Sequence, residues 1–243
     1  NTTGAAPVDI WSLRASGYAN APVGGDLNVI SHGGSITVNA TNGPVSFQNV
    51  VADSVGVGIG IGSRGGTISI TSKSDASISN LLSAAGKNGS NAGPISINST
   101  AGSVILSGTT NLSGDSSSSR GWGGLLTVNA ATNISVSGQI TADGVGEGGY
   151  AGVVNMTAQG ALSSTTPIVA RGLQAGGSGG YATGGRVGLR AVTGALSLAA
   201  GANIDVSSPG ASAGGISLSS SSASGVIANS DLLASGSGAG SLG

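Results

Sequence analysis

The sequence repeats a short alternation of apolar and polar residues about seven times along the chain. Successive copies begin roughly 27 to 33 residues apart, a spacing typical of solenoid proteins. A unit of this size is too small to bury its own apolar face, so neighbouring units must stack to form a common core. The copies of this first segment are Ser35–Val38, Thr67–Ile70, Pro94–Ile97, Leu125–Val128, Val153–Met156, Arg186–Leu189 and Gly215–Leu218.

Two further short apolar segments follow most copies, which indicates three strands per repeat and a triangular coil. The second segment is clear at Val45–Phe47 and Leu196–Leu198, and the third at Ile168–Ala170 and Ile204–Val206. Helix signals are absent because glycine interrupts every stretch of helical length. The pattern therefore predicts an all-β fold, a right-handed parallel β-helix (β-solenoid) of about seven triangular coils.

The first segment also predicts two core ladders, each with one apolar residue from every coil. Residues that alternate along a strand point to opposite faces, so only every second residue enters the core. One predicted ladder contains Ile36, Ile68, Ile95, Leu126, Val154, Val187 and Ile216. The other contains Val38, Ile70, Ile97, Val128, Met156, Leu189 and Leu218.

The repeat covers residues 24–243, which we interpret as a single solenoid domain. Residues 1–23 fit the repeat poorly and are predicted to form an irregular N-terminal segment or a partial coil. Glycine-rich loops such as Gly144–Gly149 and Gly176–Gly185 precede the first segments, so they are expected to project from one corner. No capping helix is visible, and open solenoid ends expose unpaired strand edges. The chain is therefore expected to be part of a longer solenoid or a unit that stacks end to end.

Composition argues against several functional classes. The chain has 47 glycines, 7% charged residues and a net charge of −1, so it lacks the basic stripe that nucleic-acid binding requires. No apolar run approaches the roughly 18 residues that span a membrane. Cysteine is absent, which excludes disulfides and cysteine-based metal sites. The mean hydropathy of +0.28, with regularly spaced apolar residues, favours an ordered protein over a disordered one.

Chemistry-bearing residues are sparse and scattered. His32 is the only histidine, and no carboxylate recurs at a fixed offset that would orient it as a catalytic base. The acidic residues lie about one per coil, without the clustering that calcium binding or acid–base catalysis needs. We therefore expect no enzyme activity, no catalytic or metal site and no cofactor. The acidic residues are Asp9, Asp26, Asp53, Asp75, Asp115, Asp143, Glu147, Asp205 and Asp231.

Two groups of residues are candidates for interactions. Trp122, Tyr150 and Tyr181 each lie a few residues before a first segment, which predicts a row of aromatic rings at one corner. Such a row would stack on sugar rings or dock a neighbouring filament, unless each ring folds back over its own glycines. Asp143 and Arg171 occupy equivalent places in consecutive coils and are predicted to form an exposed ion pair between coils, worth about 0 to 1 kcal/mol.

The repeat unit, Gly-Gly-x-Ile-x-Ile followed by Ile-x-Ala-x-Gly, resembles that of filamentous-haemagglutinin-like adhesins, large bacterial exoproteins of the two-partner secretion type. The best copies are Gly65–Gly86, Gly124–Gly144 and Gly152–Gly172. The resemblance implies a right-handed β-helix, export across an outer membrane and a role in adhesion or biofilm. The Asn-Pro-Asn-Gly and Asn-Pro-x-x-Leu motifs of the family's secretion domain are not present in the sequence.

The expected function is therefore structural: an extracellular rod or fibre segment at a bacterial cell surface, involved in attachment or in a biofilm matrix. Its expected partners are other copies of itself, a host or matrix surface, and glycans, with neither nucleic acid nor a membrane span. Two alternatives remain open. One is a filament subunit that stacks end to end through its open edges, and the other is a carbohydrate-binding β-helix.

Overall fold

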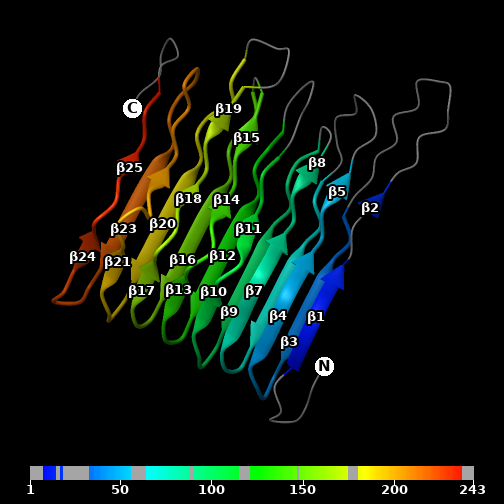
Figure 1. Cartoon of the computed structure of the whole chain (residues 1–243), viewed down its shortest axis with the longest axis vertical. Helices are drawn as coiled ribbons and strands as arrows, with labels where there is room; N and C mark the ends of the chain where they lie inside the picture. The colour runs from blue at the N-terminus through cyan, green and yellow to red at the C-terminus, as the bar shows by residue number, and fades with distance from the viewer. Residues whose placement is uncertain are drawn as a thin grey trace.

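The computed structural model describes residues 8–14, 17–18, 33–55, 64–87, 90–114, 121–146, 148–174 and 180–236. Within these ranges the chain is all-β, without helices, and its named strands pair in parallel. Coil stacks upon coil, so that the first and last strands, β1 (Val8–Arg14) and β25 (Leu232–Leu233), lie at opposite ends of the stack (Figure 1). The structure thus confirms the predicted parallel β-solenoid.

The first segment of each coil forms one face of the solenoid, a seven-stranded sheet. Six turns of the chain connect these seven strands, so the sheet is about 29 Å across at the usual spacing between strands. In spatial order the strands are β3 (Ile36–Ala40), β6 (Ile68–Ser72), β9 (Ile95–Ser99), β12 (Leu125–Ala130), β16 (Val153–Ala158), β20 (Arg186–Ala191) and β23 (Gly215–Ser220).

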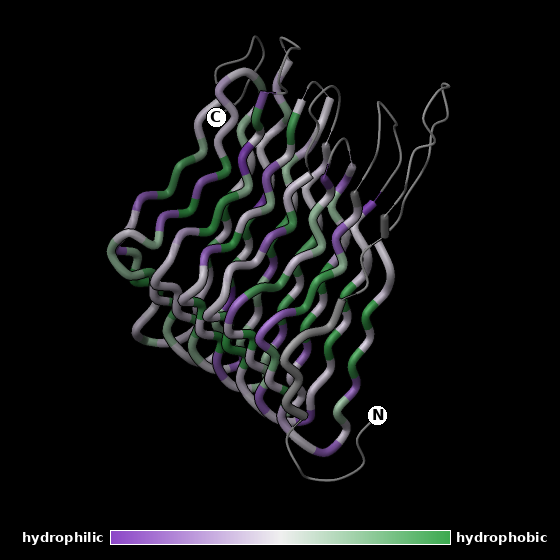
Figure 2. Tube along the Cα trace, turned by 45° about the vertical axis from the view of Figure 1, so that its right-hand side comes forward, coloured by the Kyte–Doolittle hydropathy of each residue, from purple (hydrophilic) through white to green (hydrophobic). Residues whose placement is uncertain are grey.

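Both predicted core ladders are confirmed by the register of this sheet. The pairing aligns every member of the first ladder from Ile36 to Ile216, and every member of the second from Val38 to Leu218. In the interior coils these side chains are fully buried, and the polar residues between them face outward. Figure 2 shows the resulting alternation of hydrophobic and hydrophilic residues along the strands. A shift of one residue would turn each strand inside out, which is why the pattern specifies the register.

The second and third segments form the opposite face, a thirteen-stranded sheet. Near the N-terminal end the two segments run together in β4 (Val45–Val51) and β7 (Ala76–Ser83), and their register slips between Phe47 and Asn49. In later coils a short corner separates them. The second segments are β10 (Val104–Leu106), β13 (Ile134–Val136), β17 (Leu162–Ser164), β21 (Leu196–Leu198) and β24 (Val226–Ala228). The third segments are β11 (Thr109–Asn111), β14 (Ile140–Thr141), β18 (Ile168–Val169), β22 (Ile204–Asp205) and β25.

One strand of this sheet, β11, has no apolar residue and was not among the predicted third segments. Its central residue, Thr110, pairs with Leu82 on one side and Ile140 on the other. Thr110 is only 1% exposed, so it occupies a position in the core that its neighbours fill with aliphatic side chains. The register of the adjacent coils, rather than the hydrophobicity of β11, decides that this segment is a strand.

Short strands after the third segments mark the edge from which the loops emerge (Figure 1). At the N-terminal end, β1 pairs in parallel with β4, so Val8–Arg14 form a partial coil that continues the solenoid. The predicted boundary at residue 24 lies outside the described residues. The short strands are β2 (Gly17–Tyr18), β5 (Ser54–Val55), β8 (Gly86–Lys87), β15 (Gly144–Val145) and β19 (Gly172–Leu173).

Candidate functional site

The loop corner of the solenoid contains a ladder of one residue per coil, each four positions before the first core residue of its coil. We call Arg64, Asn91, Trp122, Tyr150 and Thr183 the corner ladder. Parallel bridges join Arg64 to Asn91 and Tyr150 to Thr183. Between them, the Ala92 N–H donates to the Trp122 carbonyl and the Gly123 N–H donates to the Tyr150 carbonyl, both at 2.8 Å. Backbone pairing therefore aligns these five residues along the solenoid axis.

Trp122 and Tyr150 stand next to each other on this ladder and are exposed to solvent. Their side chains are 47% and 55% exposed, respectively. The ring centroids lie 5.8 Å apart with an interplanar angle of 84°, an edge-to-face contact worth about 0.5 to 1.5 kcal/mol. The Trp122 backbone N–H also donates to Asn91 Oδ1 at 2.9 Å. The two rings are thus held in a fixed arrangement while much of their surface stays accessible.

Tyr181 does not belong to this ladder, so the predicted row of three aromatic residues is wrong in that respect. It lies two residues before Thr183 and bridges to Gln174 within its own loop. Its ring covers Gly210, where any Cβ would overlap the ring carbons. Tyr181 is partly buried and covers a glycine, but that glycine lies in the loop of the next coil, whereas the alternative interpretation expected glycines of its own loop. Tyr181 lies six residues before the first core residue of its coil, whereas Trp122 and Tyr150 each lie four residues before theirs. This difference in the sequence could have distinguished Tyr181 from the other two aromatic residues.

A second ladder, entirely of glycine, forms the floor beside the aromatic rings. It lies two residues before the first core residue of each coil. A Cβ on any of these glycines from Gly66 onward would overlap the backbone carbonyl oxygen of the ladder glycine one coil earlier, as between Gly152 and Gly124. The ladder consists of Gly34, Gly66, Gly93, Gly124, Gly152, Gly185 and Gly214.

The same glycines close the base of the loops. From Gly66 onward, the N–H of each ladder glycine donates to the carbonyl of the residue that follows the third segment of the preceding coil. The loop closed in this way runs from Val206 to Gly214 in the shortest case and from Ala170 to Gly185 in the longest. The six bonds are 2.6 to 2.9 Å long and run from Gly66 to Ala52, Gly93 to Ala84, Gly124 to Leu112, Gly152 to Ala142, Gly185 to Ala170 and Gly214 to Val206. Loops of different length thus start and end at one constant junction.

Two shallow grooves flank the aromatic pair on the outer face of the seven-stranded sheet. A groove of about 320 Å³ lies between Arg64, Trp122, Leu125 and the ladder glycines. Another of about 780 Å³ begins at Tyr150 and extends over Asn155 and Arg186 towards Ser217. Val153 lines both grooves, so they meet beside the rings. Leu125 is itself 42% exposed, as the alternation of its strand, with Leu126 in the core, could have indicated.

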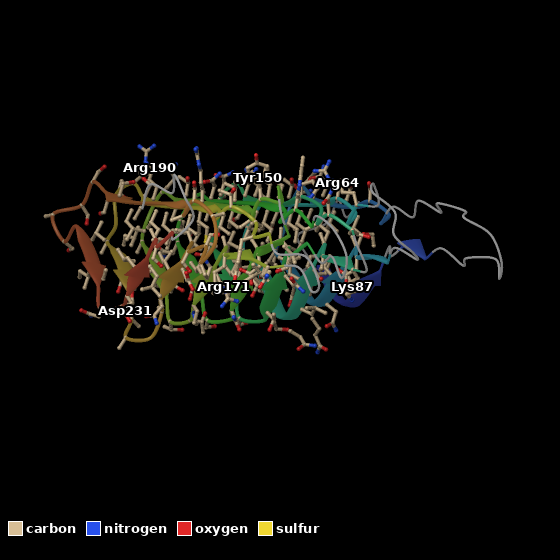
Figure 3. All side chains as sticks on the ribbon, turned by 90° about the horizontal axis from the view of Figure 1, so that it is seen from above. Arg64, Lys87, Tyr150, Arg171, Arg190 and Asp231 are labelled. Carbon is tan, nitrogen blue, oxygen red and sulfur yellow. The ribbon has the colours of Figure 1, made fainter. Side chains whose placement is uncertain are left out.

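The charged residues lining these grooves are Arg64 and Arg186, and no carboxylate of the described residues lines them. Figure 3 shows Arg64, Tyr150 and Arg190 on one side of the solenoid, with Lys87 and Arg171 on the other. Among the described residues, the ion pairs are those of Lys87 with Asp53 and of Arg171 with Asp143. Within the described part of the chain, the arginines of the sheet face therefore have no acidic partner.

The predicted pair of Asp143 and Arg171 is present, with Arg171 Nη2 3.0 Å from Asp143 Oδ2. The Arg171 backbone N–H also donates to Asp143 Oδ1 at 2.7 Å. The pair is only partly exposed, because Asp143 is 5% exposed whereas the Arg171 side chain is 41% exposed. The hydrogen bond to Asp143 raises the pKa of Arg171, and burial opposes it in part. Asp53 repeats the arrangement by accepting from the Ala85 N–H and from Lys87 Nζ, so this position joins neighbouring coils rather than forming a reactive site.

Other chemistry is sparse in the described ranges. No group of three histidine, cysteine, aspartate or glutamate side chains there could hold a metal ion. Nor does any helix in those ranges have the length and hydrophobicity to cross a membrane. His32, Asp26, Asp115 and Glu147 lie outside the described residues, as does the side chain of Asp9.

No protein-family description, similar curated protein or similar solved structure was found for this chain.

Proposed function

We propose that this chain is a structural segment of an extracellular rod at a bacterial cell surface, and that it displays its loop corner for attachment. The main support is the constant closure at that corner. Hydrogen bonds from the glycine ladder fix the base of every described loop, although the loops differ in length. A scaffold of this kind tolerates changes in its loops, because loop-closure free energy rises only slowly with length. The resemblance to filamentous-haemagglutinin-like adhesins is consistent with this proposal.

The cell-surface location is tested by labelling intact cells that produce the protein with an antibody raised against this chain. We expect labelling without permeabilisation, and loss of the signal after brief external proteolysis of intact cells. A cytoplasmic protein labelled in parallel controls for leakage. Labelling that requires permeabilisation would rule out the surface rod. Attachment is then tested by deleting the gene, which is expected to reduce the retention of cells on a surface under flow.

The exposed edge of the last described coil favours a second candidate, a filament subunit that stacks end to end. Val226, Ile227, Leu232 and Leu233 in β24 and β25 are each 41 to 45% exposed. Within the described part of the chain, no further coil covers these strands, and open parallel edges pair readily with other chains.

Electron microscopy of the purified chain over a concentration series separates the two candidates. The rod proposal predicts short particles at every concentration. Long fibres at high concentration would favour the filament, and Leu232→Lys together with Ile227→Lys should then abolish them, because charge at an open edge opposes strand pairing. Ile105→Lys, at an exposed position in the middle of the same sheet, is the matched control.

A further inference from the structure

We propose that the outer face of the seven-stranded sheet, together with Trp122 and Tyr150, binds an acidic polysaccharide whose sugars carry carboxylate groups. The proposal goes beyond the rod function and does not depend on the location of the protein. Failure of the surface-labelling experiment would therefore leave the binding test unaffected.

The aromatic pair offers a surface on which a sugar ring can pack. Trp122 and Tyr150 present exposed ring surface beside grooves that have glycine for a floor, so a flat ligand can approach the backbone closely. Pyranose rings have apolar faces of C–H groups that pack against aromatic rings, and tyrosine and tryptophan combine such packing with a polar edge. Exposed Leu125 enlarges the same apolar surface.

The polar residues of the sheet can form hydrogen bonds with sugar hydroxyls. Next to the rings, Thr127 and Asn155 stand in register on the outer face, and two coils further on Ser217 follows in the same row. Parallel pairing spaces consecutive members of this row by about 4.8 Å. Hydroxyl and amide groups can both donate and accept hydrogen bonds, as sugar hydroxyls require. Between Asn155 and Ser217, Gly188 leaves the groove open.

Charge determines the class of polysaccharide. Arg64, Arg186 and Arg190 are exposed, lie on this face and have no carboxylate partner within the described residues. Guanidinium groups bind carboxylates with paired hydrogen bonds. Arg64 and Arg186 are four coils apart, about 19 Å at the usual strand spacing. Each of these guanidinium groups can bind one carboxylate of a uronic-acid chain, whereas binding to a nucleic acid needs many more phosphate contacts.

Binding of polygalacturonate, measured by isothermal titration calorimetry, tests the proposal. We expect binding that weakens with salt, and weaker binding of the fully methyl-esterified polymer, which has the same backbone without charge. Trp122→Ala together with Tyr150→Ala should lower the affinity at least tenfold. Arg186→Gln together with Arg190→Gln, at exposed positions, should lower it several-fold without affecting folding.

Two control variants alter other parts of the surface. Lys73→Gln removes an exposed cation near the opposite corner, and Ile105→Ala removes an exposed apolar side chain from the other sheet. Both should bind within twofold of the unmodified chain. The proposal is overturned if polygalacturonate does not bind, if Lys73→Gln weakens binding as much as the double substitution of Arg186 and Arg190, or if oligothymidylate binds equally well. The last result would indicate a nucleic-acid surface instead.

Discussion

At the scale of single residues, the absence of a side chain matters as much as its presence. The ladder from Gly34 to Gly214 runs through seven coils, and a Cβ would overlap the carbonyl of the coil before it at each described step. Because the backbones approach so closely, the N–H of each ladder glycine from Gly66 onward can close a loop at its base. Glycine is needed here for space, because none of these ladder glycines has a positive φ.

Gly152→Ala is therefore expected to destabilise the protein by about 1 to 3 kcal/mol or more, since the backbone of Gly124 must move to accommodate the methyl group. Chemical denaturation monitored by circular dichroism measures the change. Gly215→Ala is the matched control, because a Cβ at Gly215 meets nothing within 4 Å. Equal effects of the two substitutions would contradict the role assigned to the ladder.

The carboxylate of Asp143 also acts at this scale, through two different bonds. Asp143→Asn keeps an oxygen for the Arg171 N–H but loses the ion pair, which is worth at most about 1 kcal/mol because the Arg171 side chain is 41% exposed. Asp143→Ala also leaves that N–H without its acceptor, which costs about 1 kcal/mol or more in addition. We expect the alanine variant to be clearly less stable than the asparagine variant in thermal unfolding. If the two variants unfold alike, the backbone hydrogen bond contributes nothing measurable.

At the scale of elements, each strand is stabilised by the register of the coils on either side. Strand β11 shows this most clearly, because Thr110 fills a core position between Leu82 and Ile140 although its own segment is polar. Its Oγ1 is buried and has no hydrogen-bond partner within the described residues. Burying an unpaired hydroxyl costs about 1 to 3 kcal/mol. Strand β11 therefore lowers the stability of the fold locally, and its pairing with the neighbouring strands keeps it in place.

Thr110→Val should raise the stability of the protein by about 1 kcal/mol, since valine has nearly the same shape and no hydroxyl to desolvate. Differential scanning calorimetry would detect the higher unfolding temperature. The same substitution at Thr109, which is exposed, serves as the control and should change the unfolding temperature little. A lower stability for Thr110→Val would mean that the hydroxyl has a partner such as an ordered water.

At the scale of the whole molecule, the solenoid is nearly one-dimensional, since each coil packs mainly on the coil before and the coil after. Leu196, Leu198 and Ile204 are fully buried in the penultimate described coil. The equivalent side chains of the last coil are exposed because no coil follows them within the described ranges. Position along the stack, rather than residue type, sets the burial of these side chains.

Deleting residues 214–243 should leave a folded solenoid with the sum of coil interactions reduced by one interface. We expect a lower free energy of unfolding. We also expect this free energy to fall less steeply with denaturant concentration, in proportion to the lost buried surface. Deleting residues 199–243 ends the chain within a coil. This deletion should lower the free energy of unfolding by more than the loss of whole coil interfaces predicts. Complete loss of structure on removing only the last coil would show instead that the solenoid folds as one indivisible unit.

Sequence alone determined the repeat, the parallel sheet and both core ladders, because a slip of one residue would turn the apolar face of a strand outward and the matching copies set which residues align. It also brought Asp143 and Arg171 together, since both lie at the same place in consecutive coils. These features follow from local alternation and a nearly constant spacing.

Only the tertiary structure decided the features that depend on stacking between coils. It separated Tyr181 from Trp122 and Tyr150, because loop length changes the residue that reaches the corner. It showed that the polar segment around Thr110 is a strand, because pairing with β7 and β14 on either side holds its backbone extended. It also gathered Arg64, Arg186 and Arg190 on one face, where no described carboxylate pairs with them. The face on which a side chain lies depends on its offset from the core residue of its coil.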